Sequence, residues 1–263
     1  MKRPGGLFLQ IDRRIFVGMR PLHVTVLIAA IGLSPLPLAA QDTVQARRVE
    51  FTADLGFVNT SGNANVTTFN LGDKLVLRTR DSSHIFTQLF GLVYGRSDGE
   101  TVADNWRASG RYEHSVNSHV YLYALLGMDR DRLAGISRRF EESLGLTWKA
   151  FTGPRTELGL EGGLSFIQER PTAGAGNDFL SGRASALFLH KFRENVSFTQ
   201  GLEFLPNLEQ ADDYRINSET AVVASVSRNI SFKTSYAIRF DKTPEPGFTS
   251  TDRLLTTGLQ IRY

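Results

Sequence analysis

Charged residues recur at alternate positions through most of this 263-residue sequence. In an extended strand such positions share one face, and we predict that this face lines the inside of a closed sheet. The predicted lining residues are Arg107, Arg111, Glu113, Arg139, Glu141, Glu157, Glu161, Arg183, Glu203, Glu219, Lys233 and Arg239. The same face would include Lys149, Lys191, Arg215, Asp241, Asp252 and Arg262.

Two interpretations of this charged face remain open. Charges of both signs can line a water-filled channel and set its ion selectivity. They can also pair across a narrow lumen and close it, because buried charges require partners. Two tyrosines, Tyr121 and Tyr123, are expected to point inward and to narrow the lumen further.

Catalysis by a serine and a histidine is the second chemistry that these residue types could support. After residue 40 the histidines are His84, His114, His119 and His190, and two of them adjoin a serine, as His114-Ser115 and Ser118-His119. Neighbours on a strand point to opposite faces, so we expect neither pair to make a nucleophile–base contact on its own. We therefore predict no enzyme. A lipid-modifying enzyme with a serine–histidine pair assembled across strands is the alternative.

No cofactor or metal site is predicted. Asp212-Asp213 and Asp129-x-Asp131 lack the spacing of a calcium loop, and no phosphate-binding glycine pattern occurs. The calculated pI of 9.3 belongs to the leader, since the first 40 residues hold five of the 30 bases and one of the 27 acids. The remainder carries 25 bases and 26 acids, which argues against a nucleic-acid partner.

The elements that must position these residues are strands, because apolar residues alternate with polar ones from Val49 onward. In residues 230–241, Ile230, Phe232, Tyr236, Ile238 and Phe240 share one face. We predict strands at 49–58, 66–78, 84–94, 105–116, 119–129, 137–151, 155–168, 179–192, 196–205, 214–227, 230–241 and 251–263. Strands 84–94 and 179–192 are apolar on both faces, so the inward set in these two is not determined.

These strands have the lengths and connections of a membrane barrel. Ten or eleven residues at a tilt near 45° cross the hydrocarbon core. The predicted connections alternate long and short without exception, and Gly95–Asp104 and Glu169–Asp178 are expected to be long external loops. An even strand count with short turns on one side is typical of outer-membrane barrels. We predict an all-β, closed antiparallel transmembrane barrel of about twelve strands.

The N-terminal segment has the pattern of a secretory signal. Basic residues end at Arg20, an apolar run occupies Val24–Leu33, and cleavage is expected after Ala40 in Leu38-Ala39-Ala40. We predict a signal peptide at 1–40, a short periplasmic lead-in at 41–48 and the barrel at 49–263, in the bacterial outer membrane. The long basic region leaves open whether Met1 or Met19 is the start.

The partners expected for such a barrel are outer-membrane lipid and the machinery that assembles outer-membrane barrels. The final aromatic residue, Tyr263, resembles the assembly signal that this machinery reads. Aromatic residues near strand ends suit interfacial girdles. They are Trp106, Tyr112, Trp148, Phe151, Phe166, Phe192, Phe204, Tyr214, Phe240 and Tyr263. The sequence gives no prediction of oligomeric state.

Several segments resemble a known family when taken in order. They are Ser61–Thr68 (SGNANVTT), Phe69–Gly72, Asp129–Arg139 (DRDRLAGISRR), Gly145–Trp148 and Glu157–Gly163 (ELGLEGG). Together they resemble the salt-induced outer-membrane protein family, a domain of unknown function, over Val49 to Tyr263. The resemblance implies an outer-membrane barrel linked to salt or osmotic stress and supplies no catalytic residues. The central motif lacks the aromatic residue that relatives more often carry near the turn.

Three functions follow as hypotheses. The first is a narrow passive channel or an envelope component linked to salt stress, and the second is a closed barrel whose long loops bind a surface partner. The third is the lipid-modifying enzyme. A soluble periplasmic β-protein is the alternative to all three.

Overall fold

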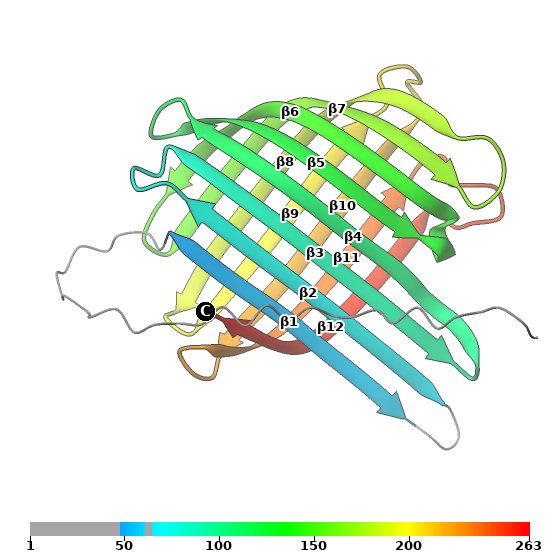
Figure 1. Cartoon of the computed structure of the whole chain (residues 1–263), viewed down its shortest axis with the longest axis horizontal. Coiled ribbons are helices and arrows are strands. Elements are labelled where there is room, and N and C mark those ends of the chain that lie inside the picture. The colour runs from blue at the N-terminus through cyan, green and yellow to red at the C-terminus, as the bar shows by residue number, and fades with distance from the viewer. Residues whose placement is uncertain (1–47, 61–64) are drawn as a thin grey trace, which may run out of the picture. The chain divides into compact units, whose positions relative to one another are not determined.

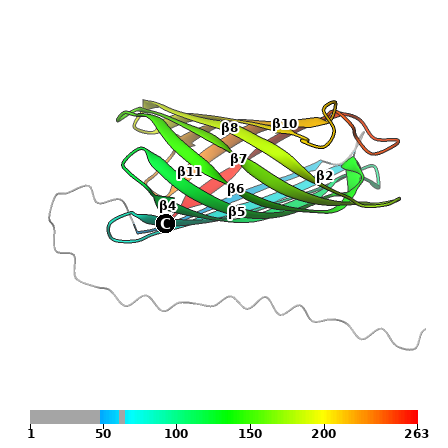
Figure 2. The ribbon, with the colours of Figure 1, turned by 90° about the horizontal axis from the view of Figure 1, so that it is seen from above.

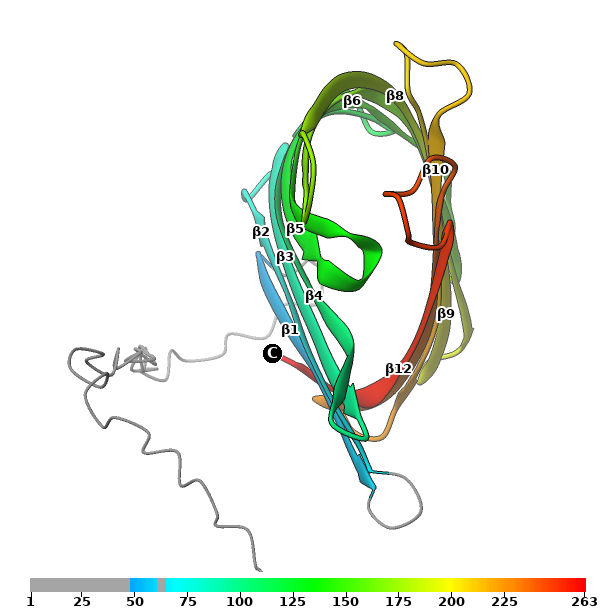
Figure 3. The ribbon, with the colours of Figure 1, turned by 90° about the vertical axis from the view of Figure 1, so that its right-hand side faces the viewer.

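The computed structural model describes residues 48–60 and 65–263, and in this part of the chain twelve strands close into one antiparallel barrel (Figures 1 and 3). The strands are β1 (Val49–Thr60), β2 (Val66–Arg78), β3 (His84–Ser97), β4 (Glu100–Ser115), β5 (Val120–Asp131), β6 (Ile136–Thr152), β7 (Thr156–Pro171), β8 (Asn177–Arg193), β9 (Val196–Pro206), β10 (Tyr214–Ser225), β11 (Ile230–Asp241) and β12 (Thr251–Arg262). A 3₁₀ turn, η1 (Arg132–Ala134), follows β5. The predicted fold class is confirmed.

Every strand pairs with its sequence neighbours, and β1 pairs with β12 to complete the ring. Where β1 and β12 pair, from Thr52–Arg262 to Leu55–Leu259, closure satisfies the backbone groups of what would otherwise be edge strands. The start of β1 and the end of β12 lie together, since Thr52 pairs with Arg262. We call this end of the barrel the terminal end and the opposite one the far end. Figure 2 shows the strongly tilted strands from a second direction.

The predicted alternation of long and short connections is wrong between β3 and β4. Gly95–Asp104 is not a long loop, because β3 and β4 continue to a two-residue turn at Asp98-Gly99. Both turn residues have positive φ, 48° and 88°, as the tight hairpin turn favoured by Asp-Gly requires. Asp98-Gly99 is the sequence signal for this turn, and it lies within the ten residues predicted to be loop.

The second predicted long loop, Glu169–Asp178, is shorter than expected, because β7 continues to Pro171 and β8 begins at Asn177. Several strands extend further toward the far end than predicted, because cross-strand pairing continues through polar residues that were predicted to be loop. The longest connections in the described residues are 207–213 and 242–250, both at the far end.

Residue alternation divides the barrel wall into two faces. The outward face carries large exposed apolar side chains on every strand, including Leu55, Leu126, Leu144 and Leu255. Aromatic rings cluster at both ends of this face, with Phe204, Tyr214 and Phe240 in contact at the far end. Among the described residues no helix is long and apolar enough to cross a membrane. The predicted signal peptide at 1–40 and most of the lead-in at 41–48 lie outside the described residues.

Candidate functional site: the charged lumen

The pairing register places all twelve predicted lining residues on one face of the sheet. Arg107, Asp129, Arg139 and Glu169 are direct cross-strand neighbours from β4 to β7. Glu203 and Asn217 continue the same face on β9 and β10, and Arg239 on β11. Because paired residues point to the same side, the row from Arg107 to Glu169 alternates in charge across β4 to β7, and Glu203, Asn217 and Arg239 share its inward face. The inward set of β3 includes Leu89, and that of β8 includes the predicted Arg183 together with Leu187.

One group of inward residues, which we call the charge cluster, centres on Glu161 of β7. This carboxylate accepts hydrogen bonds from Arg111 at 2.8 Å and from Arg183 at 2.6 Å. Arg183 also donates to Glu203 at 2.9 Å, and Arg111 lies 3.2 Å from Glu113. The cluster thus links β4 to β7, β8 and β9, and each of its carboxylates is paired with an arginine within the lumen.

Tyr123 of β5 anchors the charge cluster. Its side chain is 1% exposed, and the Arg111 guanidinium lies 4.1 Å from the ring centroid. The Tyr123 hydroxyl accepts a hydrogen bond from Arg183 at 2.9 Å. It also fills the space left by two glycines, because a Cβ on Gly145 or Gly163 would lie 2.7 Å from the hydroxyl oxygen. The predicted inward orientation of Tyr121 and Tyr123 agrees with their burial in the structure.

A second group, the far-end network, crosses the lumen nearer the far end. Arg139 donates to Glu169 at 2.6 Å and lies 3.5 Å from Asp129. Glu169 is 5% exposed and is also 3.1 Å from Arg215, which donates to Asp241 at 2.8 Å. The network therefore joins β5, β6 and β7 to β10 and β11 through alternating charges, and it narrows the passage between those walls.

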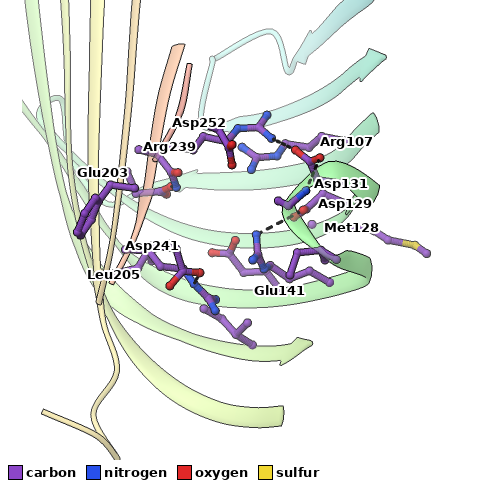
Figure 4. Close-up of a pocket in the computed structure, with 18 of the residues that line it drawn as sticks. Arg107, Met128, Asp129, Asp131, Glu141, Glu203, Leu205, Arg239, Asp241 and Asp252 are labelled. Carbon is purple, nitrogen blue, oxygen red and sulfur yellow. Dashed lines mark hydrogen bonds and ion pairs between the residues drawn. The ribbon is translucent and has the colours of Figure 1, made fainter. Parts of the chain in front are cut away.

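A cavity of about 240 Å³ is lined by members of the far-end network, by Arg183 and Glu203 of the charge cluster and by Glu245 near the far mouth (Figure 4). Arg107, Asp131, Arg239 and Asp252 point into it from β4, β5, β11 and β12. Arg239 lies 3.4 Å from Asp131, whereas Arg107 has no hydrogen bond or ion pair within the described part of the chain. The cavity therefore offers charged groups of both signs, one of which is unpaired.

Two connections cover the far mouth of the barrel. The β5–β6 connection, which contains η1, and the β11–β12 connection at 242–250 both turn inward in Figure 3. They touch one another, since a Cβ on Gly135 would lie 2.7 Å from the ring of Phe248. Glu245 in the second connection lines the cavity, and its burial raises the pKa of its carboxyl above the usual value. The nearby charges of Glu169 and Asp241 raise this pKa further.

Part of the inward face is in contact with solvent, and we call this part the open lining. On one side of the barrel it comprises Lys74 of β2 and Leu89 of β3, and on the other Leu187 of β8 and Glu219 of β10. Leu89 is 44% exposed and Leu187 is 60% exposed although both point inward. Glu219 is exposed and makes no hydrogen bond or ion pair with any described residue. Water therefore reaches the lumen along these walls.

The remaining predicted residues take three kinds of position. Glu141 accepts hydrogen bonds from Ser143 at 2.7 Å and from Ser165 at 3.1 Å. Lys233 donates to Asp54 at 2.6 Å, beside the β1–β12 junction. Glu157, like Arg107 and Glu219, has no ionic partner among the described residues. The structure thus brings Arg111, Glu161, Arg183 and Glu203 together and leaves Arg107, Glu157 and Glu219 apart.

Several inward carboxylates are absent from the predicted set, among them Glu169, Asp131 and Asp54. Glu169 and Asp131 fall in predicted loops, because the predicted strands end three and two residues before β7 and β5 do. Asp54 lies inside a predicted strand and accepts from both Lys233 and Gln260. The signal was available in all three cases, since each continues the alternation of its own strand. A prediction that continued the alternation of charged residues beyond the predicted strand ends would have included Glu169 and Asp131.

The histidines require one correction. Ser118 and His119 do make contact, with 2.8 Å between Oγ and Nδ1, because they lie in the β4–β5 turn, where strand alternation does not apply. Both are exposed, and no carboxylate among the described residues hydrogen-bonds to His119. At the terminal end His84 stacks on Tyr112 and lies beside His114 with the rings tilted, and His190 forms a hydrogen bond with Thr156. In this part of the chain no group of three metal-ligating side chains converges.

Comparison with known structures finds barrels of low identity. The translocator domain of the autotransporter NalP from Neisseria meningitidis is 12% identical, covers 82% of this chain and 87% of its own, and gives a TM-score of 0.48. A NanC porin is 7% identical, with coverages of 81% and 97% and a TM-score of 0.45. An outer membrane channel from Pseudomonas putida F1 is 12% identical, with coverages of 82% and 93% and a TM-score of 0.45. At these values the likenesses support no inference about function.

Comparison of sequences gives the family. The uncharacterized protein YdiY of Escherichia coli (strain K12) is 25% identical over 164 residues, which are 62% of this chain and 64% of that relative. The matched region thus spans less than two thirds of the relative's length. The family described as "Protein of unknown function, DUF481" matches residues 53–263. This confirms the family resemblance read from the motifs, whereas the link to salt stays a prediction. Because the match extends over most of the sequence, the chain belongs to the DUF481 family.

Proposed function

We propose that the chain is an outer-membrane barrel that forms a narrow passive channel for small ions. The observation that carries this proposal is the open lining, where Lys74 and Glu219 are inward-facing and exposed to solvent. A lumen filled for stability alone would pair or bury such charges. Unpaired charges of both signs beside water are instead the arrangement by which pores set selectivity.

The charge cluster and the far-end network would restrict this channel without filling it. Both lie against particular strands, and their central members Glu161, Arg183, Arg139 and Glu169 are each held by two or more partners. Groups held in this way leave a passage of fixed width, which suits ions and small polar solutes better than large ones. The two connections at the far mouth add a further constriction.

The membrane orientation follows from the lengths of the connections. Periplasmic turns of outer-membrane barrels are short, and external loops are longer. The terminal end carries the three-residue turn at 153–155 and the two-residue turn at 194–195, while the far end carries 207–213 and 242–250. The terminal end, with both strand ends and Tyr263, would face the periplasm. This is where the assembly machinery would meet the final residue.

The first experiment is single-channel recording from refolded, detergent-purified protein in planar bilayers. We expect steady conductance steps that grow with salt concentration. In a salt gradient, Glu219→Lys should move the reversal potential toward anion preference, because the changed charge lies in the water-filled lumen. The matched control is Glu142→Lys, which changes an outward-facing carboxylate on β6. No conductance from protein shown to be folded would refute the channel.

A second candidate is a closed barrel whose external connections bind a surface partner. The contact of Gly135 with Phe248 across the far mouth favours it, since covered mouths block passage. Shortening 242–250 distinguishes the two candidates. A channel conducts as the wild type and should conduct more after the shortening, whereas a closed binding barrel is silent as the wild type and should lose its partner after the shortening. The link to salt stress is a separate proposal, tested by growth of a deletion strain at high salt.

A further inference from the structure

Two histidines face one another on the outward side of the barrel at its terminal end. His84 begins β3, and His114 near the end of β4 is its direct cross-strand partner. They are thirty positions apart in the sequence, and the β3–β4 hairpin brings them together. Arg111 and Glu113 of β4 point into the lumen, so His114, the next residue along the strand, points outward.

The backbone at this position favours close contact between the two side chains. The N–H of Ser115 donates to the carbonyl oxygen of Ser83 at 2.7 Å, directly beside the histidines. His84 and His114 therefore form a non-hydrogen-bonded pair, the type of antiparallel pair in which opposite side chains lie closest. Both histidines are exposed, so an ion can reach them from solution.

The two imidazole rings turn their Nδ1 atoms toward one another. These nitrogens are 3.4 Å apart, whereas the ring centroids are 4.8 Å apart. The Nδ1 atoms therefore lie on the facing edges of the rings. Two nitrogens that bind one tetrahedral zinc ion at about 2.0–2.1 Å lie about 3.3–3.4 Å from each other. The separation of the two nitrogens is thus the one that a single bound ion requires.

Hydrogen bonds alone do not satisfy this arrangement. Nδ1 of His84 also lies 2.6 Å from the hydroxyl oxygen of Tyr112. An imidazole Nδ1 carries either one hydrogen or one lone pair, so His84 cannot form a full hydrogen bond with both Tyr112 and His114. An ion between the two Nδ1 atoms would be a common partner for both lone pairs. The hydroxyl of Tyr112, a residue that is 45% exposed, could then bond to water.

We propose that His84 and His114 form a binding site for a divalent transition-metal ion such as Zn²⁺. Imidazole suits Zn²⁺ and Cu²⁺, whereas Mg²⁺ requires oxygen ligands. In the described part of the chain no third histidine, cysteine or carboxylate joins the pair, so water would complete the coordination. The bound ion would link β3 to β4 outside the lumen, and the proposal therefore goes beyond the channel and does not depend on it.

Isothermal titration calorimetry of the refolded, detergent-purified protein, without a polyhistidine tag, tests the site. We expect one Zn²⁺ per chain, tighter binding of Cu²⁺ and no binding of Mg²⁺. His84→Gln and His114→Gln should each weaken Zn²⁺ binding about a hundredfold, because a single imidazole lacks the gain from joint binding. The matched controls are His119→Gln and His190→Gln, which should bind Zn²⁺ like the wild type.

Urea unfolding gives a second readout, after the electrophoretic shift of each variant has shown that it is folded. An ion that binds the folded chain alone stabilises it. Zn²⁺ should therefore raise the urea midpoint of the wild type and of His190→Gln. It should leave the midpoints of His84→Gln and His114→Gln unchanged.

Three results would overturn the proposal: two independent Zn²⁺ ions per chain, equal Zn²⁺ affinity in the wild type and both histidine variants, or equal binding of Mg²⁺. One ion per two chains in a Zn²⁺-dependent dimer would also overturn it, because the site would then lie between copies. Conductance separates this proposal from the channel. A silent barrel that binds Zn²⁺ through both histidines overturns only the channel, and a conducting barrel without this binding overturns only the metal site.

Discussion

The charge cluster and the open lining occupy the same barrel face and differ in how their charges are satisfied. In the charge cluster Glu161 bonds to two arginines, and Tyr123 is almost fully buried beneath them. In the open lining Glu219 faces water alone. Residue type and alternation thus place a charge on the inner face. The shape of the opposite wall then determines whether that charge finds a partner and stabilises the fold or remains available to solutes.

The largest effect is expected from breaking the charge cluster at its centre. Glu161→Gln leaves Arg111 and Arg183 without their shared carboxylate, and we expect a loss of about 3 kcal/mol in the free energy of unfolding. The measurement is urea unfolding in lipid vesicles, followed by the electrophoretic shift of the folded barrel. Glu157→Gln on the same strand is the control and should change stability by less than about 0.5 kcal/mol. Similar losses in both variants would mean that the cluster contributes no specific stability.

A smaller loss is expected from filling the space beneath Tyr123. Gly163→Ala places a Cβ 2.4 Å from the Leu144 carbonyl oxygen and 2.7 Å from the Tyr123 hydroxyl, so the surroundings must shift. Such overpacking costs about 1–3 kcal/mol. The adjacent Gly162→Ala meets no atom within 4 Å and should leave the unfolding midpoint unchanged or slightly raised. Equal effects at both positions would refute the close fit of Tyr123 against the glycines.

At the open lining we expect changes of function without changes of stability. Lys74→Gln should leave the urea midpoint within about 0.5 kcal/mol of the wild type, because this lysine has no ionic partner among the described residues to lose. In a salt gradient its reversal potential should move toward cation preference, opposite in sign to Glu219→Lys. An unchanged reversal potential would place the conducting path away from Lys74. It would mean that the exposed charges of the open lining do not set ion selectivity.

The smallest effect concerns pH and the far mouth. The raised pKa of Glu245 means that it takes up a proton as pH falls, before an ordinary glutamate would. Protonation removes its repulsion from Glu169 and Asp241, although it also removes its attraction to Arg215. Because burial and the two carboxylates outweigh the arginine, the connection at 242–250 should settle into the mouth and conductance should fall at acidic pH. Glu245→Gln should flatten this pH profile, and a profile identical to that of the wild type would contradict the role of Glu245.

Much of the fold could be predicted from the sequence, because membrane strands obey a simple period. All twelve strands are present, and the alternation in residues 230–241 alone indicates which side chains of β11 face outward. The connections were harder. Asp98-Gly99 closes a tight hairpin where a long loop was expected, since cross-strand pairing continues through polar residues as readily as through apolar ones.

The candidate site was predictable as a set of positions but not as a set of contacts. Alternation can place Glu161 and Glu219 on the same face, yet it cannot tell which of them meets an arginine from a strand three positions away. That depends on the curvature of the closed ring and on small residues such as Gly145 and Gly163, which admit a buried tyrosine. The sequence likewise gave no sign that the β1–β12 ladder stops at Leu55–Leu259, because both strands continue beyond it.

The short β1–β12 ladder also has a consequence for the order of folding. Eleven junctions of the barrel join strands adjacent in sequence, so each can form as a local hairpin. The twelfth joins residues about two hundred positions apart. The entropic cost of closing this long loop must be offset by a few residue pairs near the chain ends. Ring closure should therefore be the last kinetic step, and deleting the final residues should slow it far more than shortening any hairpin would.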